Sequence, residues 1–122
     1  MTTQKAYERI RAWFLRPGAV FGFDREEGNC VYRGGSKTYS RVRCAVGCLI
    51  PPKNYTDQLE GMGPHQLVIY ELPDLFAGIN VKFLEQAQTL HDNEACKVEP
   101  SIPNFIAELD KLARQFKLEV VS

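Results

Sequence analysis

The segment that begins at Ile102 carries one continuous apolar face at helical spacing, and this feature constrains the fold more than any other. The face is built from apolar residues at steps of three and four: Ile102, Phe105, Ile106, Leu109, Leu112, Ala113 and Phe116. A helix with such a face must bury it against another element. Ser101 can cap this helix, and Pro103 is tolerated in its first turn. The sequence therefore predicts a strong amphipathic helix that packs on a core.

Two further segments have the same periodicity. The first runs from about Thr3 to Arg16, with Thr2 or Thr3 as its cap and Pro17-Gly18 as its end. The second runs from Asn80 to Asp92, with Asn80 as its cap. Their apolar faces comprise Ala6, Tyr7, Ile10, Trp13 and Phe14 in the first, and Val81, Phe83, Leu84, Ala87, Leu90 and His91 in the second. Three helices are thus expected to form most of the fold.

The segment between the first two helices is less regular. Residues 19–23 form a short apolar run that suits either a strand or an ordered loop, and residues 24–29 are typical of a turn. Cys30–Arg33 and Thr38–Arg43 resemble the arms of a β-hairpin, with a reversal at Gly34-Gly35-Ser36. We therefore expect an α+β fold, a helix-dominated single domain over residues 1–122 with a small β-hairpin or short antiparallel sheet.

Three stretches that follow remain ambiguous. Residues 44–50 suit a short buried helix or a buried strand, and Pro51-Pro52 ends either one. Residues 56–62 predict one helical turn. In residues 65–76, Leu67-Val68-Ile69-Tyr70 resembles a strand, whereas Pro73-Asp74-Leu75-Phe76 resembles a helix start.

Charge is distributed unevenly along the chain. Fifteen basic and fifteen acidic side chains cancel overall, but residues 28–56 contain five basic side chains and no Asp or Glu. The remaining residues therefore carry a net charge of −5. A stretch of one sign creates a field that attracts anionic partners.

This basic stretch is the first candidate site. Its glycines offer backbone N–H groups, and Arg41 and Arg43 alternate so that an extended strand would project both from one face. Arginine binds phosphate in a bidentate manner, and tyrosine can stack on a base. The predicted ligand-binding residues are Tyr32, Arg33, Lys37, Tyr39, Arg41 and Arg43. The alternative is a solvated basic hairpin tip without a ligand.

A metal site is a second candidate. Three residues lie between Cys44 and Cys48 and four between His91 and Cys96, and a Cys3His set suits structural zinc. Neither pair has the Cys-x-x-Cys spacing, and Cys30 stays unassigned. Since cysteine is often buried, scattered core thiols explain the same residues. We therefore expect no cofactor, with zinc as the alternative.

A catalytic pair is a third candidate. Cys44 lies at a candidate helix start that would favour a thiolate, and His91 is the candidate base. Asp92 is not expected to share the helical face of His91, so no orienting carboxylate is assigned from the sequence. The alternative is a histidine at the core edge that bonds backbone or a nearby carboxylate. The sequence favours a binding protein over a Cys–His hydrolase or transferase.

Targeting features and partners follow from composition. The amino terminus lacks the apolar stretch of a secretory signal, and no apolar run approaches a membrane span, so we expect a cytoplasmic protein that does not contact membranes. With no net charge, the chain is better suited to a compact anionic small molecule or an acidic host protein than to extended nucleic acid. Self-association stays an open alternative.

Several strings resemble a group of small uncharacterised proteins from bacteriophages and prophages. The most specific is Arg-Cys-Ala-Val-Gly-x-Leu-Ile-Pro, and the whole set is Cys30-x-Tyr32-Arg33, Arg43 to Pro51, Tyr55, Leu59-Glu60-Gly61 and Gln86-x-x-x-Leu90-His91-Asp92. The resemblance implies the cytoplasm of a bacterial host and brings no established activity. It suggests an accessory protein that sequesters an anionic, nucleotide-like host signal as counter-defence. The alternatives are the Cys–His enzyme and a host-protein interaction module with structural cysteines.

Overall fold

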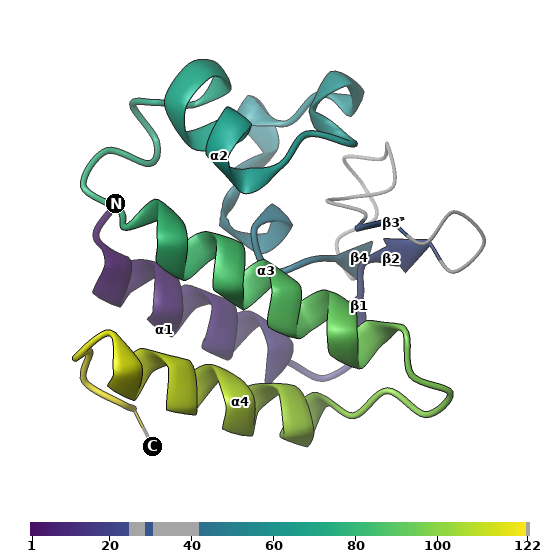
Figure 1. The fold of residues 1–122 in the computed structure, drawn as a ribbon. Helices are drawn as coiled ribbons and strands as arrows, with labels where there is room; N and C mark the ends of the chain where they lie inside the picture. The colour runs from purple at the N-terminus through teal and green to yellow at the C-terminus, as the bar shows by residue number, and fades with distance from the viewer. Residues whose placement is uncertain (25–28, 31–41, 122) are drawn as a thin grey trace.

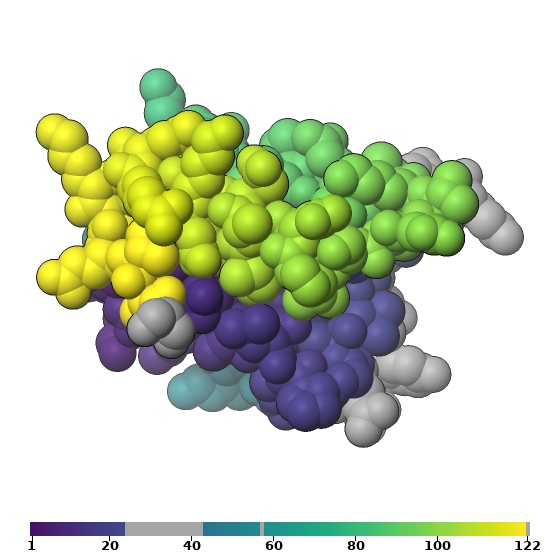
Figure 2. All heavy atoms as spheres, turned by 90° about the horizontal axis from the view of Figure 1, so that it is seen from below, coloured from purple at the N-terminus to yellow at the C-terminus, as the bar shows by residue number. Residues whose placement is uncertain are grey.

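Three helices form the body of the protein. The computed structural model describes residues 1–24, 29–30 and 42–121. The helices α1 (Thr3–Phe14), α3 (Val81–Ala95) and α4 (Ile102–Gln115) lie side by side, and short strands gather at one end of them (Figure 1). From below, α4 and α1 are seen lying along one face of the molecule (Figure 2). The predicted helix-dominated fold is confirmed.

Local side-chain caps explain where these helices begin. The Thr2 hydroxyl accepts from the Lys5 N–H at 3.1 Å, and the Asn80 side chain accepts from the Lys82 N–H at 2.9 Å. The Ser101 hydroxyl accepts from the Asn104 N–H at 3.2 Å. Each cap satisfies a donor that has no partner within the helix. All three predicted caps are confirmed, with Thr2 rather than Thr3 at the first helix.

The core lies where the apolar faces of the three helices meet the segment 44–76. Its largest fully buried side chains are Tyr7, Tyr55, Phe14, Phe76, Phe83, Phe105, Ile10, Ile50, Leu67 and Leu84. Phe14 and Phe105 pack edge to face, with their ring centroids 4.9 Å apart. The faces predicted from helical periodicity are therefore the faces that are buried.

The strands are short and differ from the expected hairpin. Each has two residues: β1 (Val20–Phe21), β2 (Phe23–Asp24), β3 (Asn29–Cys30) and β4 (Val42–Arg43). β2 pairs antiparallel with β3, whereas β1 pairs in parallel with β4. Most of the predicted hairpin falls outside the described residues, and its described ends pair with β2 and β1. A sheet of more than two strands is not formed by the part of the chain that the structure describes.

The ambiguous stretches of the sequence are helical. Residues 44–62 contain single turns of 3-10 helix, η1 (Gly47–Leu49), η2 (Pro52–Asn54) and η3 (Asp57–Leu59). The short helix α2 (Pro64–Gln66) continues into the π-helical turn η4 (Leu67–Glu71), so the strand-like appearance of this run was misleading. Helical winding buries Leu67 and Val68 and leaves Ile69 and Tyr70 exposed. Within the described residues, none of the helices has the length and apolar character needed to span a membrane.

A polar network joins α1, α4 and the chain that follows α4. Asp110 accepts hydrogen bonds from the Tyr7 hydroxyl at 2.6 Å and from Arg11 Nε at 3.0 Å. The Gln4 side chain donates to the Glu119 carbonyl and accepts from the Glu119 N–H, both at 2.9 Å. This network fixes the C-terminal segment along α1.

Candidate functional site

The most specific string of the sequence forms a buried turn. Cys44, Ala45 and Val46 are fully buried. The Cys44 sulfur accepts from the Gly47 N–H at 3.3 Å, and the side chain of Gln88 on α3 accepts from the Val46 N–H at 3.0 Å. These bonds satisfy backbone donors that would otherwise be buried without a partner. The string therefore has a structural role that fixes the direction in which β4 enters the core.

Gln88 also organises the polar side chains of α3. Its amide donates to Asp92 Oδ1 at 2.8 Å, and His91 Nδ1 lies 2.8 Å from the same oxygen. Since a carboxylate only accepts, this contact places the proton of a neutral His91 on Nδ1. The expectation that Asp92 would not orient His91 was wrong, because the Asp92 side chain turns back along the helix to reach the ring.

The other edge of the His91 ring faces aromatic side chains. Its ring centroid lies 5.2 Å from that of Phe21, 5.7 Å from that of Phe14 and 6.0 Å from that of Phe105. His91 is fully buried, and within residues 1–24, 29–30 and 42–121 its Nε2 atom has no hydrogen-bond partner. An unsatisfied polar atom in such surroundings destabilises the fold by about 1–3 kcal/mol.

Arg43 on β4 carries the second buried atom of this kind. Its side chain is half-buried, and Nε is shielded from solvent without a hydrogen-bond partner among the residues that the structure describes. Burial lowers the pKa of Arg43; the neighbouring Cys48 opposes this effect, and Arg16 adds to it. Among the described residues, no carboxylate forms an ion pair with Arg43.

Arg43 and His91, the residues that carry these two atoms, are both neighbours of Phe21. Phe21 pairs with Arg43 across the β1–β4 ladder, and its ring contacts the ring of His91. Arg16 begins the turn that leads into this ladder, since its carbonyl accepts from the Ala19 N–H at 3.2 Å. We call Arg16, Phe21, Arg43 and His91 the cationic corner. Among the described residues, it combines two arginines that form no ion pair and two buried nitrogen atoms that have no hydrogen-bond partner.

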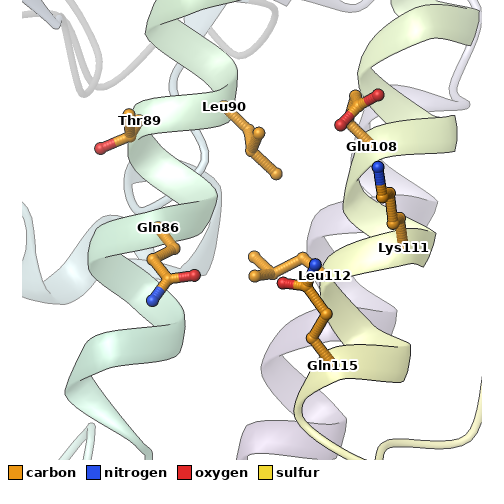
Figure 3. Close-up of a pocket in the computed structure, with 7 residues that line it drawn as sticks. All are labelled: Gln86, Thr89, Leu90, Glu108, Lys111, Leu112 and Gln115. Carbon is orange, nitrogen blue, oxygen red and sulfur yellow. The ribbon is translucent and has the colours of Figure 1, made fainter.

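Two hollows lie on the described surface. One, of about 390 Å³, opens beside β1 and β2 and is lined by Ala19, Val20, Phe21, Phe23, Ala95, Pro100 and Ile102. The other, of about 290 Å³, lies between α3 and α4, where Leu90 and Leu112 extend from the two helices and the amides of Gln86 and Gln115 lie on either side of Leu112 (Figure 3). Glu108 and Lys111 stand together at the rim of the second hollow, so this rim has no charge preference. Only the first hollow shares a residue, Phe21, with the cationic corner.

The alternative catalytic pair, Cys44 and His91, lies in two different surroundings. Cys44 is fully buried, and among the described residues no hydrogen bond joins its sulfur to His91. Burial raises the pKa of Cys48 to about 12, and its thiol donates to the Ala45 carbonyl at 3.0 Å. A nucleophile needs both access to its substrate and a base, and Cys44 has neither in this arrangement.

The candidate zinc ligands are also dispersed. Cys44 and Cys48 belong to the buried turn, His91 faces the phenylalanines, and Cys96 is exposed at the end of α3. Among the residues that the structure describes, no group of three or more His, Cys, Asp or Glu side chains could hold a metal ion. Cys44, Cys48, His91 and Cys96 therefore do not form the predicted Cys3His site.

Of the predicted anion-binding residues, Arg43 is described. Tyr32, Arg33, Lys37, Tyr39 and Arg41 lie outside the described residues and remain predictions. Sequence reasoning missed Phe21, Arg16 and Gln88. A signal for Gln88 was present, because it interrupts the buried stripe of α3 at the positions Leu84, Gln88, His91 and Ala95. Comparisons with protein families, characterised proteins and solved structures find no match to this chain.

Proposed function

We propose that the protein binds an anionic ligand at the cationic corner, with Arg43 as the principal contact. The observation that carries the proposal is the Arg43 Nε atom, which is buried and has no acceptor within the described residues. Removing a guanidinium from water without a partner is unfavourable, and a bound anion would offset that penalty. Binding an anion should therefore be more favourable at this corner than at an exposed arginine.

The surrounding charges support the same conclusion. Arg16 is exposed and lies close enough to Arg43 to lower its pKa. Two like charges held near one another repel, and a phosphate or carboxylate between them would relieve the repulsion. Arg43 also belongs to the basic stretch of the sequence, residues 28–56, whose charge of one sign attracts anions.

Capture without turnover is the mode of action that we propose. The inaccessible thiol of Cys44 and the neutral thiol of Cys48 leave the buried turn without an activated nucleophile. The resemblance to phage and prophage proteins suggests that the captured anion is a nucleotide-like host signal. An acidic host protein is the alternative ligand, and the resemblance does not distinguish the two.

Isothermal titration calorimetry with inorganic phosphate, pyrophosphate and AMP tests the proposal. The comparison uses the wild type, Arg43→Met and the matched control Arg114→Met, which alters an exposed arginine on α4. We expect saturable binding to the wild type and to Arg114→Met, and a loss of roughly tenfold or more in Arg43→Met. Binding that is equal in all three proteins, or absent from all three, would refute a site at Arg43.

A further inference from the structure

We infer that the hollow beside β1 and β2 holds a planar aromatic ring of the ligand whose anionic group lies at Arg43. This inference rests on the proposed function, and it assigns the chemical class of the ligand as an aromatic anion such as a nucleotide. The hollow has a volume of about 390 Å³, which falls within the range of small-molecule sites.

The position of the hollow connects it to the cationic corner. Phe21 lines the hollow and pairs with Arg43 in the β1–β4 ladder. Residues paired across neighbouring strands lie close together, so a ligand with its ring against Phe21 brings an attached anion towards the guanidinium. Arg16 and Ala19 are joined by a backbone hydrogen bond of 3.2 Å, and Ala19 lines the same hollow. Two lining residues, Phe21 and Ala19, are therefore the backbone neighbours of Arg43 and Arg16.

The lining determines which part of a ligand fits there. Among the described residues, every side chain that lines the hollow is apolar, and Val20 remains 49% exposed, so apolar surface is left open to solvent. Phe21 and Phe23 occupy alternate positions of the chain, an arrangement that points two rings to one side of extended backbone. Aromatic side chains bind nucleobases through stacking, and every base offers the same kind of face.

The same lining also predicts which ligands the hollow does not distinguish. A purine is identified by hydrogen bonds to its edge, and among the described residues the side chains that line the hollow can neither donate nor accept one, which leaves such bonds to backbone groups. We therefore expect the side chains to contribute nothing to discrimination between adenine and guanine. The ring would contribute to affinity by stacking and desolvation, while the anionic group sets the orientation.

Titration calorimetry with inorganic phosphate, ribose 5-phosphate, phenyl phosphate, AMP and GMP separates the ring from the anion. We expect AMP and GMP to bind within a fewfold of each other and roughly tenfold or more tighter than ribose 5-phosphate. Equal affinity for AMP and ribose 5-phosphate would overturn the ring site while leaving the anion site intact. Absence of binding by every phosphate would overturn the anion site and the ring site together.

Two substitutions identify the surface that holds the ring. Phe23→Leu keeps apolar volume but removes an aromatic face, and the control Phe116→Leu does the same to a half-buried ring packed on Phe83. We expect Phe23→Leu to lower the affinity for AMP towards the affinity for ribose 5-phosphate. The affinity for ribose 5-phosphate should stay unchanged in this variant, and Phe116→Leu should change neither affinity. A loss that is equal for both ligands, or equal in both variants, would contradict the assignment. Phenyl phosphate that binds as well as AMP would assign the site to aromatic anions in general, and weaker binding would assign it to nucleotides; either result supports the ring site.

Discussion

Arg11 and Arg43 are both partly buried, but only Arg11 has a carboxylate partner among the described residues. Arg11 donates to Asp110 through Nε at 3.0 Å and through Nη2 at 3.4 Å. The hydrogen bond to Asp110 raises the pKa of Arg11, whereas burial lowers the pKa of Arg43. The two side chains therefore represent two uses of arginine within one small domain.

The difference separates a part of the fold built for stability from a part that retains unsatisfied groups. Between α1 and α4, the charged and hydroxyl groups of Tyr7, Arg11 and Asp110 satisfy one another. At the cationic corner, Arg43 Nε and His91 Nε2 have no hydrogen-bond partner in the part of the chain that the structure describes. Buried polar groups without partners are rare in folded proteins and tend to mark functional sites. The comparison predicts that substitutions between α1 and α4 will lower the stability of the fold. Substitutions of the arginine at the cationic corner should leave the stability of the fold unchanged and abolish ligand binding.

The largest loss of stability is expected from Asp110→Ala. The substitution removes the acceptor of both Tyr7 and Arg11, and we expect the free energy of unfolding to fall by about 3 kcal/mol. Urea denaturation monitored by circular dichroism measures the change. Glu108→Ala, which removes an exposed carboxylate of the same helix, should alter stability by less than about 0.5 kcal/mol. Equal effects of the two variants would show that the network does not stabilise the fold.

The next largest effect is expected from Gln88→Met. Methionine keeps the volume but leaves the Val46 N–H without an acceptor, so the free energy of unfolding should fall by about 2 kcal/mol. The matched control is Gln86→Met, an exposed position two residues earlier on α3. A Gln88→Met variant as stable as the control would mean that the buried turn does not depend on α3.

The fold could be predicted from the sequence wherever the determinants are local. A helix cap and an apolar helix face both depend on neighbours a few residues away. The helix starts predicted at the caps Asn80 and Ser101 are therefore confirmed. The pairing of Val20 with Val42 joins distant segments, and a two-residue strand leaves no periodic pattern. For the site, the sequence identified Arg43 by its charge, but Phe21 became relevant only through its contact with His91 in the folded chain.

A smaller, pH-dependent effect is expected at Glu94, which is buried at the end of α3. Burial by itself raises its pKa, but hydrogen bonds from Lys97 at 2.8 Å and from the Ser101 N–H at 2.9 Å outweigh burial and lower it. A carboxyl group with a lowered pKa in the folded state stabilises the fold above its unfolded pKa, and this stabilisation is lost as the pH falls. Glu94→Gln should therefore cost about 1 kcal/mol at pH 7 and lose less stability than the wild type between about pH 5 and pH 3.

Urea denaturation at pH 7, 5 and 3 checks the Glu94 prediction. Glu99→Gln is a suitable control, since Glu99 is an exposed carboxylate in the turn that follows α3. If the two variants had the same acid dependence as the wild type, the Glu94 contacts would not contribute to stability.

The smallest change in stability is expected from Arg43→Met. Methionine retains an apolar side chain and removes a desolvated charge without a partner, so the free energy of unfolding should stay within about 0.5 kcal/mol or increase. Arg11→Met should instead lower it by about 2 kcal/mol, because Asp110 loses a charged donor. Similar losses in both variants would show that Arg43 has a stabilising partner and would remove the basis of the comparison.

The Arg43 side chain can be observed directly by nuclear magnetic resonance. In a titration of the ¹⁵N-labelled protein with phosphate, we predict that the Nε–Hε signal of Arg43 moves downfield and saturates, because a bound anion supplies the acceptor that Nε lacks. The Arg11 signal should stay in place, since its acceptor is already Asp110. An Arg43 signal that does not move while those of exposed arginines shift would contradict an anion site at the cationic corner.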